Sequence, residues 1–240
     1  SDIKKARDLL QGYDLQGHID AYNILYQQYR TTHGKSSENL KNILETVRNS
    51  IYSSITPAYL DYINNKIKPN YDRRRPPIKL ENIIEMNIFH WKIDFGHIML
   101  KGGFDIIVGN PPYVSAVKHS KDNKLERSIY RNIYEEVQGS YDLYSIFLLR
   151  GLQITNQNNI YSWIIPNKLL VSDYASKILI KLKEAGLSHS IDVSIFDVFK
   201  NIGIYPIIIM SNNKKEVKYI QYMINKIGDL VNNELIRIKE

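Results

Sequence analysis

Hydrophobic residues in the first part of the chain recur at positions that share one face of a helix. Five such positions follow Ser36 and Ser37, which can cap a helix. They are Leu40, Ile43, Leu44, Val47 and Ile51. Thr56 before Pro57 predicts the start of a second helix, because proline is favoured in the first turn. We therefore expect residues 1–70 to be helical.

A polar and basic stretch that ends in two prolines, residues 70–77, precedes a different pattern. Beyond it, four short apolar runs are typical of buried strands. They lie at residues 104–108, 161–165, 190–196 and 207–210. Residues 142–154 and 175–186 between these runs have helical character. The order strand, helix, strand, helix, strand, strand predicts a mainly parallel α/β sheet that ends in a hairpin.

Composition narrows the chemistry that this chain can perform. The 240 residues contain no cysteine, which excludes disulfide frameworks, thiolate zinc sites and any methyl transfer that needs a cysteine nucleophile. A net charge of +7 suits an anionic partner such as nucleic acid. No run of about eighteen apolar residues is present, so we expect a soluble, cytoplasmic protein without a membrane span.

A four-residue motif comes directly after the first predicted strand. Asn110, Pro111, Pro112 and Tyr113 follow the apolar residues 104–108 and a glycine. In an open α/β sheet, ligands bind beyond the carboxyl ends of the strands. The motif therefore lies where a binding site is expected.

The motif suits methyl transfer to an exocyclic amino group, whose nitrogen lone pair is delocalised into the ring. The Asn110 side-chain oxygen and the Pro111 carbonyl can accept its two N–H bonds, which favours a pyramidal nitrogen. The consecutive prolines Pro111 and Pro112 restrict the backbone and fix that carbonyl. Tyr113 offers a flat face for an extruded base. The alternative interpretation is a turn that ends a strand, with Tyr113 packed on the surface.

Residues 104–114 (FDIIVGNPPYV) resemble the catalytic motif of the S-adenosylmethionine-dependent DNA methyltransferases that act on amino groups. In that family, asparagine at the first motif position favours adenine over cytosine. Further segments follow the order and approximate spacing seen in combined restriction-modification enzymes of type IIG. They are FHWKIDF at 89–95, GSYDLY at 139–144, WIIPNKL at 163–169 and VFKNIGIYPIII at 198–209. The resemblance covers residues 89–210, about half of the chain.

The resemblance implies roles for individual residues. Asn110 and Pro111 would hold the target amino group, and Tyr113 would stack on one face of the flipped adenine. Phe199 would contact the other face, and a core aromatic at a strand end is the alternative. Residues 142–144 and 166–167 either shape the pocket or form a helix cap and a strand-ending turn.

The resemblance also implies that S-adenosylmethionine donates the methyl group. Such enzymes bind it through a glycine-rich turn after the first strand and an acidic residue after the second. Neither feature is found in this sequence. The nearest glycines, Gly102 and Gly103, precede the catalytic strand and are expected to form a turn. The cofactor-binding residues are therefore unknown. We expect the chain to be a fragment that neither binds the cofactor properly nor methylates DNA alone.

A basic stretch follows the motif. Its candidates for contacts with DNA phosphates are Lys118, Lys121, Lys124 and Arg127, and a solvated loop is the alternative. Asp192 and Asp197 near a strand end are better explained as solvated or capping residues, so no metal site is predicted.

These observations predict an α/β protein with a partial Rossmann-like methyltransferase sheet preceded by a helical segment. Residues 1–77 would form a helical insertion and basic linker, residues 78–211 the catalytic-motif half, and residues 212–240 a helical connection towards a recognition domain. The predicted function is methylation of N6 of an adenine flipped out of double-stranded DNA, within a restriction-modification or phage-defence enzyme. The alternatives are methylation of a glutamine amide in a protein and a noncatalytic DNA-binding module.

Overall fold

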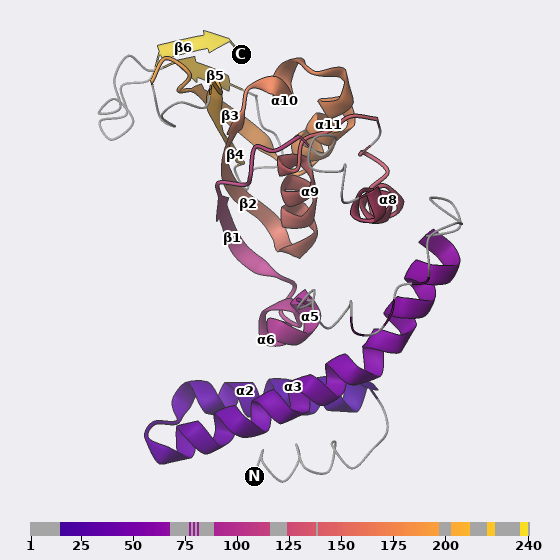
Figure 1. Ribbon diagram of the computed structural model, residues 1–240. Helices are drawn as coiled ribbons and strands as arrows, with labels where there is room; N and C mark the ends of the chain where they lie inside the picture. Colours follow the sequence, from indigo (N-terminus) through magenta and orange to yellow (C-terminus); the bar gives the residue numbers. More distant parts are fainter. Residues whose placement is uncertain are drawn as a thin grey trace. The chain divides into compact units, whose positions relative to one another are not determined.

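The computed structural model divides the chain into two compact units, Ser1–Lys101 and Gly102–Glu240 (Figure 1). The described residues are 15–67, 77, 79, 81, 89–115, 124–137, 139–196, 203–211, 220–223 and 236–239. The division lies downstream of residue 77, where the sequence predicted the end of the helical insertion and its basic linker. Each unit has its own hydrophobic core.

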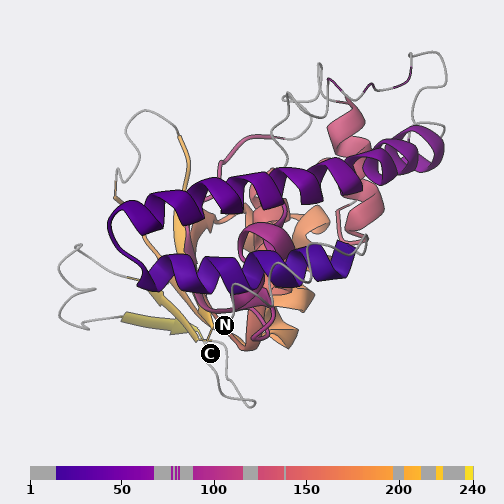
Figure 2. The same ribbon diagram turned by 90° about the horizontal axis from the view of Figure 1, so that it is seen from below.

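Two long helices dominate the first unit. α2 (Leu15–Thr31) and α3 (Lys35–Tyr62) lie side by side in Figure 1 and Figure 2. The chain reverses at Gly34, whose φ of 70° is a left-handed conformation that glycine adopts without strain. Buried apolar residues of both helices pack together with Ile93. They include Ala21, Leu25, Leu44, Val47 and Ile51.

The prediction of a second helix that begins at Thr56 is wrong, because α3 continues through Pro57. The Thr56 hydroxyl donates to the Tyr52 carbonyl one turn back, at 2.6 Å. A proline inside a helix removes one backbone hydrogen bond, and the bonds of the neighbouring turns keep the helix continuous here. A π-helical turn, η1 (Ile63–Ile67), follows directly.

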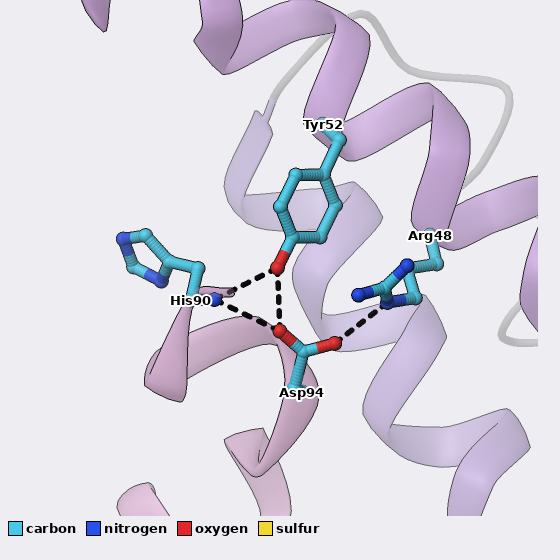
Figure 3. Close-up of polar contacts among 4 residues, drawn as sticks. All are labelled: Arg48, Tyr52, His90 and Asp94. Carbon is cyan, nitrogen blue, oxygen red and sulfur yellow. Dashed lines mark hydrogen bonds and ion pairs between the residues drawn. The ribbon is translucent and has the colours of Figure 1, made fainter. Parts of the chain in front are cut away.

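A polar cluster joins α3 to the short helices α5 (Trp91–Asp94) and α6 (Gly96–Met99). Asp94 accepts hydrogen bonds from Arg48 Nε at 2.6 Å and from the Tyr52 hydroxyl (Figure 3). The backbone N–H of His90 donates to the Tyr52 hydroxyl at 2.8 Å and to Asp94 Oδ2 at 2.9 Å. Burial and the bonded Asp94 carboxylate raise the pKa of Tyr52, so its hydroxyl remains a donor.

The described residues of the second unit form a six-stranded sheet with the order β1-β2-β4-β3-β5-β6. The strands are β1 (Phe104–Gly109), β2 (Thr155–Pro166), β3 (Leu187–Asp192), β4 (Pro206–Ser211), β5 (Ile220–Met223) and β6 (Ile236–Lys239). β1, β2, β3 and β5 point in one direction, whereas β4 and β6 run antiparallel to their neighbours. The predicted α/β class and the antiparallel pairing of the last two predicted strands are confirmed.

The described parts of residues 212–240 differ from the predicted helical connection. They form β5 and β6, which extend the sheet beyond β3. In β6, Ile236 and Ile238 alternate with Arg237 and Lys239, a period of two that favours a strand over a helix. The prediction of a helix is therefore wrong for these residues.

Helices pack on one face of this sheet (Figure 1). α9 (Tyr144–Ile154) and α11 (Ser176–Glu184) contribute to the same core as the buried β2 residues Tyr161, Trp163 and Ile165. The shorter elements of this unit are α8 (Lys124–Ile133), α10 (Lys168–Val171) and η3 (Asp173–Ala175). This core supports β2, the strand beside the predicted motif.

β1 lies at one edge of the sheet in the described part of the chain. Its apolar residues Ile106 and Val108 are 60% and 77% exposed. In α/β sheets both faces are normally covered, and edge strands are normally protected. The strand that leads to the motif therefore presents uncovered apolar surface.

Candidate functional site

The motif leaves β1 at its carboxyl end. Gly109, the last residue of β1, faces Trp163, and a Cβ at this position would overlap the indole ring. Asn110 is exposed beyond it, Pro111 is buried and Pro112 is exposed. An accessible amide side chain thus precedes a backbone that two prolines restrict.

Tyr113 is anchored to the neighbouring strand. Its hydroxyl donates to the Ile164 carbonyl of β2 at 2.8 Å. Burial raises the pKa of Tyr113 to about 12, so the hydroxyl stays protonated and keeps this bond at neutral pH. The tip of the ring is therefore fixed, and the side chain is half-buried.

A cavity of about 410 Å³ opens beside Tyr113. Its wall combines the motif loop, Asp142 ahead of α9, the end of β2 and the segment that leads into β4. The lining residues are Tyr113, Val114, Ser115, Asp142, Pro166, Asn167, Lys168, Gly203, Ile204 and Tyr205. Backbone bonds of 2.8 Å hold these segments together, from Leu143 N–H to the Val114 carbonyl and from Asn167 N–H to the Tyr205 carbonyl. The cavity lies at the carboxyl ends of β1 and β2, where α/β sheets place ligands.

Asp142 brings a carboxylate to this wall. Its Oδ2 accepts a hydrogen bond of 3.1 Å from the Tyr174 hydroxyl, which lies 2.8 Å from the hydroxyl of the buried Tyr144. Because the single hydroxyl proton of Tyr174 is donated to Asp142, Tyr144 must donate to Tyr174. Burial raises the pKa of Tyr174 to about 12 and also raises that of Tyr144, so both remain donors. A directed chain of hydroxyls therefore ends on Asp142.

The sequence matches the model of the Eco57I restriction-modification methylase family over residues 16–199. The chain belongs to this family. The matched region includes the motif, Asp142 and the end of β2.

Relatives of this Eco57I-family chain are named as restriction enzymes and methyltransferases. RM.MjaORFECS2P of Methanocaldococcus jannaschii, named as a type II restriction enzyme and methyltransferase, is 35% identical over 172 residues, 69% of this chain. RM.Eco57I of Escherichia coli, named likewise, is 27% identical over 146 residues, 60% of this chain. The type II methyltransferase M.AccI of Acinetobacter calcoaceticus is 30% identical over 142 residues, 55% of this chain and 26% of that protein. The chain spans only 14% of the length of each of the first two relatives.

Among solved structures, one similar chain belongs to the type IIL restriction-modification enzyme MmeI in complex with DNA. The identity is 15% and the TM-score is 0.32, over 73% of this chain and 24% of MmeI. This score is too low to support a conclusion. None of the described helices of the Eco57I-family chain is long and apolar enough to cross a membrane.

Only some of the predicted site residues lie within the described part of the chain. Tyr113 lines the cavity, and Asn110, Pro111 and Pro112 directly precede it. Phe199 lies outside the described residues, as do Lys118 and Lys121, so their roles stay predictions.

Arg127, a predicted phosphate contact, has a partner within the chain. Lys124 begins α8, and Arg127 and Arg131 lie one turn apart on this helix. Both arginines donate through Nη2 to the Gly139 carbonyl at 2.6 Å. These bonds hold the loop that leads to Asp142, and a contact of Arg127 with phosphate stays a prediction.

Sequence reasoning left two wall segments ambiguous and missed other wall residues. Asp142 and Asn167 both line the cavity. The Asp142 carboxylate bonds to Tyr174, while the α9 N-cap residue, Leu143, has no side-chain cap bond. No role was predicted from the sequence for Lys168, which begins α10 just after β2, or for the 63% exposed Tyr205, which directly precedes β4. For Lys168, its place just beyond the carboxyl end of a predicted strand was the available signal.

Among the described residues, no glycine-rich turn between a strand and a helix forms a binding site for S-adenosylmethionine. Gly102 and Gly103 form the expected turn, with φ values of 100° and 113°. A Cβ on Gly103 would overlap the backbone of Ile154 and Thr155, so this glycine lets the turn before β1 pack against the junction of α9 and β2. We assign no described residue to the methyl donor. Within the described ranges, no group of three or more His, Asp or Glu residues could hold a metal ion.

Proposed function

We propose that this chain forms the target-base half of a DNA methyltransferase that methylates N6 of adenine within a type IIG restriction-modification enzyme. The placement of Asn110 and Tyr113 at the carboxyl end of β1, beside a cavity of about 410 Å³, carries the proposal. Family membership and relatives named as restriction enzymes and methyltransferases support it. The net charge of +7 favours binding to double-stranded DNA.

Asn110 and Pro111 act on the amino group. The Asn110 side-chain oxygen and the Pro111 carbonyl accept its two N–H bonds, which withdraws the nitrogen lone pair from the ring and directs it outwards. S-adenosylmethionine supplies the methyl group as an electrophilic carbon. No strong base is needed to activate N6, because geometry makes the lone pair available.

Tyr113 and the cavity receive a base that has left the duplex. An atom inside the base stack is out of reach, so enzymes of this kind extrude the target nucleotide into a pocket. The cavity volume lies within the range of about 300–1,000 Å³ for small-ligand sites. Tyr113 stacks on one face of the adenine and Phe199 contacts the other. Nearby phosphates are bound by Lys118, Lys121, Lys124 and Arg127.

The methyl donor binds mainly through residues outside these 240. The described residues fit the base side of the reaction, whereas no glycine-rich turn among them connects a strand to a helix. The uncovered edge strand β1 supports this division, because another strand could pair with it. The chain alone is therefore inactive.

Transfer of a labelled methyl group to DNA by the full-length protein tests this function. Asn110→Ala removes one of two acceptors, so transfer should fall by about 10²-fold or more. DNA binding should persist, since the duplex is bound largely through its phosphates. Asn132→Ala makes the same change at an exposed position of α8 and should leave transfer unchanged.

The product identifies the substrate class. N6-methyladenine in the hydrolysed DNA supports the proposal. Methylation of a glutamine in protein, methylation at another base atom, or full activity of Asn110→Ala contradicts it.

A further inference from the structure

Methylation of an amino group leaves one proton that must find an acceptor. When N6 forms a bond to the methyl carbon it becomes positively charged, and one of its protons must leave. Asn110 and Pro111 offer neutral amide oxygens, which accept hydrogen bonds and do not retain a proton at neutral pH. Once the bond to the methyl carbon has formed, a carboxylate beside the amino group would provide an acceptor that the two amide oxygens do not.

Asp142 is the anionic side chain among the residues that line the cavity. Its backbone pairs with Ser115 in an isolated β-bridge, and the next residue donates its N–H to the Val114 carbonyl at 2.8 Å. Both contacts are with residues that directly follow Tyr113. The carboxylate is therefore held next to the motif loop and at the wall of the same cavity.

The hydroxyl chain of Tyr144 and Tyr174 fixes only one oxygen of this carboxylate. Tyr174 donates to Oδ2 at 3.1 Å. For Oδ1, the described part of the chain provides neither a hydrogen bond nor an ion pair, and Lys168 in the same wall forms no ion pair with Asp142. Asp142 is half-buried, so its second oxygen is left to solvent or to a ligand in the cavity. One fixed oxygen and one available oxygen suit a proton acceptor.

We propose that Asp142 is the general base of the methyl transfer, and this inference rests on the proposed function. The lone pair of N6 forms the bond to the methyl carbon, while the carbon–sulfur bond of the methylsulfonium donor breaks and leaves its electron pair on sulfur. The proton on N6 passes to Asp142 Oδ1, directly or through one water, and is later released to solvent. Tyr174 and Tyr144 are positioning residues, because they act through Asp142.

Kinetics of the full-length protein on duplex DNA test this role. Asp142→Asn and Asp142→Ala should lower kcat by about 10²-fold and leave KM for DNA unchanged. Added formate, a small carboxylate, should restore part of the activity of Asp142→Ala and none of the activity of Asn110→Ala. Tyr174→Phe should lower kcat by a smaller factor. Asp173→Asn, an exposed neighbour with the same chemical change, is the control and should behave as wild type.

A fluorescent base separates proton transfer from base extrusion. With 2-aminopurine at the target position, Asp142→Ala should show the fluorescence increase of the wild type. Unchanged kcat in both Asp142 variants, or a loss that formate does not restore, overturns the role of Asp142 even where Asn110-dependent methylation is intact. A wild-type protein that does not methylate DNA rejects the proposed function itself.

Discussion

At the scale of single residues, the site depends on a glycine that leaves room for a tryptophan. Gly109 ends β1 and faces the buried Trp163 ring, where a Cβ has no space. Gly109→Ala should lower the free energy of unfolding by about 1–3 kcal/mol, the usual cost of overpacking a core. Urea unfolding of the chain measures this change. Val108→Ala, at a 77% exposed position, should shift it by less than about 0.5 kcal/mol. Equal stability of the two variants would show that the ring moves aside freely.

Residues that are neighbours in the sequence could be predicted as a site, whereas residues joined only by folding could not. Asn110 to Tyr113 are continuous and follow an apolar run, so their chemistry and their position could both be inferred. Asp142 left two interpretations open, because its partner Tyr174 lies 32 residues further along the chain. The sequence shows the two residues, and only the packing of η3 beside α9 shows their hydrogen bond.

At the scale of elements, the polar cluster of Figure 3 fixes α5 against α3. The Asp94 side chain is 11% exposed and accepts bonds from Arg48 and Tyr52. Asp94→Asn leaves the Arg48 guanidinium without its counter-charge, so the free energy of unfolding should fall by about 1–3 kcal/mol. Asp61→Asn is the same change at an exposed position of α3 and should cost less than about 0.5 kcal/mol in urea unfolding. If Asp94→Asn lowers the free energy of unfolding as little as the control does, apolar contacts such as those of Ile93 are enough to hold α5 against α3.

Helices and strands with a strong hydrophobic period could be predicted from the sequence. Short strands, and those whose apolar pattern is interrupted by polar residues, could not. The runs at 104–108 and 161–165 lie within β1 and β2. The third strand was placed at 190–196 and is observed at Leu187–Asp192, because the buried serines Ser188 and Ser190 break its apolar pattern. β5 and β6 contain four residues each, so the alternation in β6 is brief and β5, Ile220–Met223, shows none. Pro57 gave a false helix start, because local preference yielded to the continuous packing of α3.

At the scale of the whole molecule, the uncovered edge of the sheet favours a role within a longer protein. Among the described residues β1 has a partner strand on one side only, and Ile106 and Val108 are exposed beside it. The aligned region covers 14% of RM.Eco57I. These observations support our proposal that residues outside this chain complete the site for the methyl donor.

We therefore expect the 240-residue chain alone to show no saturable binding of S-adenosylmethionine, and the full-length protein to bind it at one site. Calorimetric titration of both proteins with the donor measures this difference, and cooperative unfolding of the shorter chain serves as the control for its folding. Binding by the longer protein alone means that the base side and the donor side of the site come from different parts of the polypeptide. Stoichiometric binding by the 240 residues would contradict this division and would place the donor among residues that now have no assigned role, with the segment around Gly102 and Gly103 as the first to mutate.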